Sequence, residues 1–167
     1  MAMTSSGSAK VTLPADDQIL VTREFDAPKH LVYKAFTTPE LVKRWWHANR
    51  GEMTVAEIDL QVGGKWRYVM IADGGMEVGF HGEYREIVPN ERIVSTETFE
   101  GLPEGVSEED GTTVNTATFA EADGRTTLAL LVQAPSKATR DAIIDSGMEA
   151  GLQDALDNLE QVAVSLG

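Results

Sequence analysis

Hydrophobic and polar residues alternate along most of the chain between residues 18 and 133. A period of two is typical of strands that bury one face. Segments rich in Gly and Asp, which favour tight turns, interrupt the alternation at residues 63–64, 72–75 and 122–124. The pattern therefore predicts about seven strands joined mostly by short turns, at residues 18–25, 53–60, 65–71, 77–88, 92–99, 112–121 and 125–133.

Between the first two strands the apolar residues change to a helical period. Asp26 is a candidate cap for a helix over residues 28–36, with Pro28 in its first turn. Thr38 is the candidate cap of a second short helix, which begins at a proline and carries two tryptophans on its apolar side. Two short helices therefore follow the first strand.

The last segment predicts a long amphipathic helix from about Ser136 to Val164, since no proline interrupts residues 138–164. One apolar stripe runs along it, formed by Met148, Leu152, Ala155, Leu159, Val162 and Leu166. Gly147 and Gly151 each cost a helix about 0.5–1 kcal/mol relative to alanine. They either allow the sheet to approach closely or leave open volume.

These elements predict an α+β fold in which a curved antiparallel sheet of about seven strands wraps around the C-terminal helix. We expect one domain over residues 17–167, preceded by a disordered lead-in at residues 1–16. The loop at residues 100–111 is rich in Gly, Pro, Glu and Asp, and we expect a solvated connection there.

The net charge of the chain is −13, and residues 84–167 contain 5 basic but 16 acidic side chains. Such a surface repels nucleic-acid backbones and anionic lipids, so neither partner is expected. No apolar run is long enough to span a membrane, and the default location is cytoplasmic. The chain has no Cys, and its three histidines have no metal-ligand spacing, so no metal or cofactor is expected. No phosphate-binding or dinucleotide motif is present.

Alternation along the strands selects side chains that face the terminal helix, although a one-residue shift in register would reverse each set. These residues are candidates for a core or for the lining of a ligand cavity. The candidates on the strands and the second short helix are Trp46, Met53, Val55, Trp66, Tyr68, Met70, Val78, Phe80, Tyr84, Phe119 and Leu130. Those on the terminal helix are Met148, Gly151, Leu152 and Ala155.

Several segments, in this order, resemble the family named after the C-terminal domain of the activator of the Hsp90 ATPase. That family lies within the START-like (SRPBCC, Bet v 1-like) superfamily, whose fold is called helix-grip. The matching segments are Arg23-Glu24-Phe25-Asp26-Ala27-Pro28, residues 32–37, residues 39–46, Val62-Gly63-Gly64-Lys65-Trp66-Arg67-Tyr68, residues 82–89, residues 92–94 and Gly147-Met148-Glu149-Ala150-Gly151.

The resemblance implies the helix-grip fold and a cavity between sheet and helix that binds a hydrophobic small molecule. Two other functions stay open. One is a chaperone-interacting module like the co-chaperone that names the family. The other is an enzyme of the polyketide cyclase or dehydratase type, in which Tyr84 or His47 moves a proton.

Overall fold

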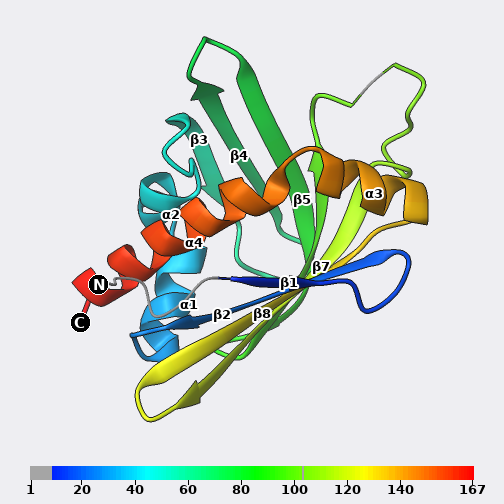
Figure 1. Ribbon diagram of the computed structural model, residues 1–167. Helices are drawn as coiled ribbons and strands as arrows, with labels where there is room; N and C mark the ends of the chain where they lie inside the picture. The colour runs from blue at the N-terminus through cyan, green and yellow to red at the C-terminus, as the bar shows by residue number, and fades with distance from the viewer. Residues whose placement is uncertain (1–8, 103) are drawn as a thin grey trace.

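The computed structural model describes residues 9–102 and 104–167. Its sheet has eight antiparallel strands in the order β1-β2-β8-β7-β6-β5-β4-β3 (Figure 1). From β3 to β8 each strand pairs with the next one along the chain, and β2 pairs with β8. The strands are β1 (Lys10–Thr12), β2 (Gln18–Phe25), β3 (Gly51–Ile58), β4 (Lys65–Ala72), β5 (Glu77–Val88), β6 (Arg92–Phe99), β7 (Thr112–Ala122) and β8 (Arg125–Gln133).

Two short helices, α1 (Lys29–Thr37) and α2 (Pro39–Trp45), separate β2 from β3, as the sequence predicts. The chain ends in α3 (Lys137–Asp145) and α4 (Met148–Ser165), and Figure 1 shows α4 crossing one face of the curved sheet. This arrangement confirms the predicted α+β helix-grip architecture.

The first strand is a correction to the predicted lead-in. Residues 10–12 pair with β2, so the expectation of disorder at residues 1–16 is wrong for this part, while residues 1–8 lie outside the described residues. Ala9 is buried, and its N–H and C=O both bond the side-chain amide of Gln153 on α4. Since β1 pairs along β2, it covers backbone groups that would otherwise lie open at the sheet edge.

The terminal helix is not continuous, which is a second correction. Ser136 caps α3 as predicted, accepting a hydrogen bond from the Thr139 N–H. The helix then stops, because Gly147 has a left-handed backbone with φ 82° and α4 begins after it. Glycine adopts this conformation at little cost, so Gly147 lets the chain change direction between the two helices. Gly151 lies inside α4 as expected.

The predicted helix caps are only partly correct. Thr38 is the N-cap residue of α2, but its side chain makes no capping hydrogen bond. Asp26 does not cap α1, whose N-cap position is Pro28. Instead the backbone N–H of Asp26 donates to a carboxylate oxygen of Glu160 on α4 at 2.8 Å.

A buried ion pair joins β2 to α4. The side chain of Arg23 is fully buried and donates to Asp157 Oδ1 at 2.6 Å and to Glu160 Oε1 at 3.2 Å. Its guanidinium carbon also lies 4.9 Å from the centre of the Phe25 ring. Removing one partner of a buried pair leaves an uncompensated charge, so this contact fixes α4 against the sheet.

Apolar side chains fill the interior at the end of the sheet next to α1. Phe119 contacts Tyr33 and Phe36 edge to face, at ring-centre distances of 5.5 and 5.6 Å. Phe119, Leu128 and Leu159 are at most 2% exposed. This closely packed end supplies the stable part of the fold and leaves the opposite end, towards β4 and β5, to be considered as a site.

Candidate functional site

Aromatic rings gather on the inner face of the sheet towards β4 and β5. Trp46, which follows α2, contacts the rings of Tyr68 on β4 and Phe80 on β5, both at 5.6 Å. Tyr68 also contacts Trp66 at 4.8 Å, and Phe80 contacts Phe99 on β6 at 5.1 Å. Edge-to-face and tilted contacts of this kind stabilise aromatic clusters.

Trp66 is held in place by a glycine on the neighbouring strand. Its indole Nε1 donates to the Thr96 carbonyl of β6 at 3.1 Å, reaching past Gly82 of β5. A Cβ atom at Gly82 would lie 2.6 Å from that nitrogen and 1.8 Å from the Thr96 oxygen. Only glycine leaves room for the indole there.

Several apolar side chains that pack against the core are only partly buried. We call this set the partly exposed interior, defined by Trp46, Met53, Phe80, Leu130, Met148 and Leu152. These six come from both walls, the sheet side and α4, while other partly buried apolar side chains, such as Phe36 beside Phe119, lie elsewhere around the core. Their partial exposure leaves apolar surface in contact with solvent, and this is space that a ligand could occupy.

The position of α4 is consistent with such space. Its backbone approaches α1 and α2 more closely than it approaches any strand. A Cβ atom added at Gly151 would meet no atom within 4 Å. Close approach of the sheet at Gly151, one of the two alternatives that the sequence left open, is therefore not observed, and a cavity there stays a prediction.

A polar group lies among these apolar side chains. Glu97 on β6 shares the inner face with Phe99 and lies opposite Thr113 of β7. Its Oε1 accepts a hydrogen bond from Asn115 Nδ2 at 3.0 Å. The Asn115 carbonyl oxygen in turn accepts one from the Thr113 hydroxyl at 2.8 Å, which orients the amide towards Glu97. Burial raises the pKa of Glu97, and the bond from Asn115 offsets part of this effect.

The hydroxyl of Tyr68 lies near this carboxyl group, and the hydroxyl of Tyr84 interacts with that of Tyr68. Burial raises the pKa of Tyr68 well above its usual value, and the neighbouring Tyr84 and Glu97 raise it further. Burial also raises the pKa of Tyr84, although its interaction with Tyr68 acts in the opposite direction. Both phenols stay neutral at physiological pH and are weaker proton donors than a free tyrosine, which gives no support to proton transfer by Tyr84.

Most of the predicted site residues come together in or around one cluster. Trp66, Tyr68, Tyr84, Phe119 and Ala155 are buried in the core. The six residues of the partly exposed interior lie against that core, and Gly151 is on α4 between Met148 and Leu152. A lining role for the predicted set stays a prediction.

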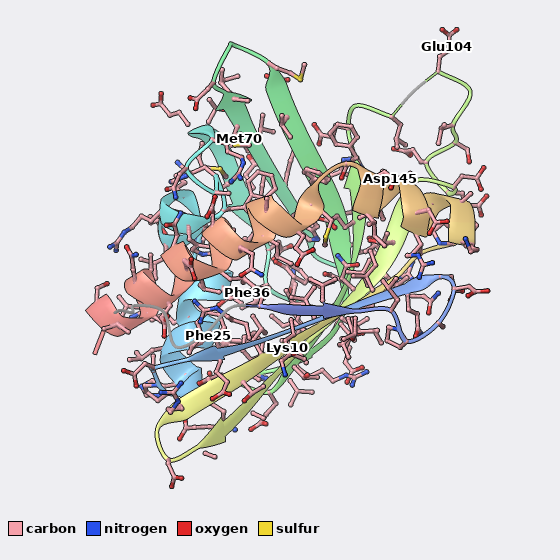
Figure 2. The ribbon with its side chains drawn as sticks, viewed as in Figure 1. Lys10, Phe25, Phe36, Met70, Glu104 and Asp145 are labelled. Carbon is pink, nitrogen blue, oxygen red and sulfur yellow. The ribbon has the colours of Figure 1, made fainter. Side chains whose placement is uncertain are left out.

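Three predicted residues lie elsewhere. Val55 pairs with Val69, so it faces the opposite side of the sheet from Tyr68, and its predicted inward position is wrong. A β-bulge between Met53 and Val55 shifts the register by one residue, which a strict period of two cannot show. Met70 pairs with Val78 on the inner face, but neither packs against the core cluster described. Figure 2 shows Met70 on the side of α4 opposite Phe25 and Phe36 in that view.

Sequence reasoning missed the polar residues of the site. Asn115 and Thr113 alternate with Ala117 and Phe119, so the predicted inward face of that strand already contained them. Glu97 alternates with Ile93 and Phe99, so the period of two already placed it on the face with these two apolar residues, but a carboxylate is not expected on an inner face. The strand pairings in the sheet place Glu97 inside.

The opposite face of the sheet carries a different set of charged residues, Glu57, Lys65, Arg67 and His81. They line a depression of about 260 Å³, which also reaches the inward-facing Trp66 and its strand partner Gly82. Arg67 makes two hydrogen bonds to Glu100, at 2.8 and 2.9 Å, and His81 Nδ1 lies 3.0 Å from the same carboxylate. These contacts lower the pKa of Glu100 to about 2, with the Arg67 hydrogen bonds as the largest cause. Lys65, Arg67 and His81 are therefore each paired with a carboxylate of the protein.

Other candidate chemistry is limited in the described part of the chain. His47 lies near the end of α2, and its Nδ1 accepts a hydrogen bond from the Asn49 N–H at 2.9 Å. No group of three or more potential metal ligands occurs among residues 9–102 and 104–167. Among the same residues, none of the helices has the length and apolar character needed to cross a membrane.

Comparison with known proteins gives one family and several solved structures. Residues 26–163 match the family described as Activator of Hsp90 ATPase homolog 1-like protein. No curated protein matches the chain.

The solved structures share the fold along nearly the whole chain. A protein from Rhodobacter sphaeroides has a TM-score of 0.84 at 23% identity, covering 94% of this chain and 99% of its own. A protein from Chromobacterium violaceum has a TM-score of 0.76 at 28% identity, covering 89% and 98%. An AHSA1-like protein from Aeromonas hydrophila has a TM-score of 0.66 at 22% identity, covering 89% and 94%.

Proposed function

The chain belongs to the Activator of Hsp90 ATPase homolog 1-like family, and on this premise we propose that it binds a lipophilic or aromatic small molecule between the sheet and α4. The ligand would lie against the partly exposed interior, in contact with Trp46, Phe80 and Met148. Aromatic and methionine side chains with a few polar groups are typical of sites for apolar ligands.

The observation that supports this proposal most directly is the open space beside Gly151. Glycine inside a helix lowers stability relative to alanine. At Gly151 this loss is not explained by close packing, because no atom lies near enough to exclude a side chain. The same side of α4 carries Met148 and Leu152, both only partly buried. A ligand would cover these side chains and remove their apolar surface from water.

The test is binding of the neutral fluorescent probe N-phenylnaphthylamine to the wild-type chain and to Gly151→Trp. An indole at this position would occupy the open space, so the variant is expected to lose saturable binding while its circular dichroism is unchanged. Val164→Trp is the matched control, because Val164 lies on α4 but is 51% exposed.

Equal affinity of both variants and the wild type would contradict the proposed position of the ligand. No saturable binding to the wild type would contradict small-molecule binding of this kind. A chaperone partner, which the family description suggests, would then be the function to test by co-purification.

A further inference from the structure

Glu97 has a feature that an apolar ligand site does not require. Its carboxyl group lies on the inner face of the sheet and has a single hydrogen-bond partner among the described residues, the amide of Asn115. Thr113 holds that amide in place, and Tyr68 lies close by. The carboxyl group is therefore oriented by protein contacts, yet most of its hydrogen-bonding capacity is unused.

Glu97 also has no counter-ion in the described part of the chain. The ion pairs that these residues form join other carboxylates to Arg23, Lys29, Arg50, Lys65, Arg67, His81, Arg92, Arg125, Lys137 and Arg140. The Glu97 residue is partly buried, and a carboxylate that loses part of its hydration without gaining a cation is less stable relative to its acid form. The raised pKa of Glu97 has burial as its largest cause.

We propose that Glu97 is the acceptor for the protonated nitrogen of a hydrophobic amine, whose apolar body lies against the partly exposed interior. The proposal rests on the proposed function and assigns the chemical class of its ligand. The amine would supply the cation that Glu97 lacks and form a charge-assisted hydrogen bond with it. Asn115 would keep the carboxylate oriented towards the ligand.

Two other observations favour a cation over a neutral or anionic head group. The rings of Phe80 and Phe99 share the inner face with Glu97, and aromatic faces attract cations. The chain has a net charge of −13, which attracts cations and repels carboxylates. A fatty acid bound here would place its carboxylate near Glu97, an unfavourable contact between like charges.

The experiment compares phenylbutylamine, phenylbutanol and phenylbutyrate by calorimetric titration at neutral pH and low salt. All three probes have the same apolar body and differ only at the head group. The variants are Glu97→Gln, which keeps the shape but removes the charge, and Glu83→Gln as the matched control. Glu83 lies on the opposite face of the sheet, where it pairs with Lys65 at 2.7 Å.

We expect the wild type and Glu83→Gln to bind the amine about tenfold more tightly than the alcohol, as one charge-assisted hydrogen bond allows. In Glu97→Gln the two affinities are expected to become equal, with binding of the alcohol retained. Equal affinity for amine and alcohol in the wild type, or an unchanged preference in Glu97→Gln, overturns this inference alone. Failure of all three probes to bind the wild type overturns both the inference and the proposed function.

Discussion

Replacing each of two glycines by alanine, four positions apart, is expected to change stability in opposite directions. Gly151 lies inside α4, and a Cβ atom there meets nothing within 4 Å. Alanine should therefore stabilise the helix by about 0.5–1 kcal/mol, because it loses less conformational freedom on folding than glycine. Gly147 has a φ of 82°, so alanine there should cost about 1–2 kcal/mol through left-handed backbone strain.

Urea denaturation of the wild type, Gly151→Ala and Gly147→Ala measures both effects as shifts of the midpoint at constant slope. In a thermal scan, 1 kcal/mol corresponds to a shift of about 2–4 °C for a domain of this size. If both variants gained stability, α3 and α4 would form one continuous helix and the structure at Gly147 would be wrong. If Gly151→Ala lost stability, the space beside Gly151 would be filled, which contradicts the proposed ligand site.

Three further predictions concern charged residues. Arg23→Met should lower the free energy of unfolding by about 3–5 kcal/mol, because it removes the buried cation that pairs with Asp157 and Glu160. Arg125→Met at an exposed ion pair should change it by less than about 1 kcal/mol, and urea denaturation compares the two variants. An NMR titration of the carboxyl groups should give Glu97 a pKa above the usual value for glutamate. The contribution of Glu97 to stability should then fall as the pH rises through that pKa, and a normal pKa would contradict the burial of its carboxyl group. Glu100 has a pKa of about 2 in the folded protein, so it should stabilise the fold at pH values above its unfolded pKa and lose this effect as the pH falls towards 2. Arg67→Ala should raise the pKa of Glu100, and an unchanged pKa would exclude Arg67 as the cause of the low value.

The strands were predictable where turn residues such as Gly, Pro, Asn and Asp fix their ends. The bounds of β5, β6 and β8 agree with the predicted residues 77–88, 92–99 and 125–133. Alternation and turn chemistry are local properties, so one sequence is enough to locate them. The family resemblance then supplied the packing of helix against sheet, which local patterns do not contain.

The features that sequence analysis missed depend on tertiary structure. Lys10–Thr12 form a strand because they pair with the free edge of β2. Three residues are too few to show the alternation by which a strand is predicted from sequence. The break at Gly147 is hidden, since glycine is compatible with both a helix and a left-handed residue. The bulge before Val55 reverses one side chain, and the strand pairing places Glu97 inside.

The most direct test of ligand binding uses the methionine methyl groups as reporters. Met53 and Met148 belong to the partly exposed interior, whereas Met76 in the β4–β5 turn is 71% exposed and serves as an internal control. The protein, labelled with ¹³C at its methionine methyl groups, is titrated with phenylbutylamine, fatty acids, sterols, flavonoids and aromatic polyketides. We expect saturable shifts at Met53 and Met148, with Met76 unchanged, for at least one class of compound. Unchanged Met53 and Met148 signals with every compound would contradict it.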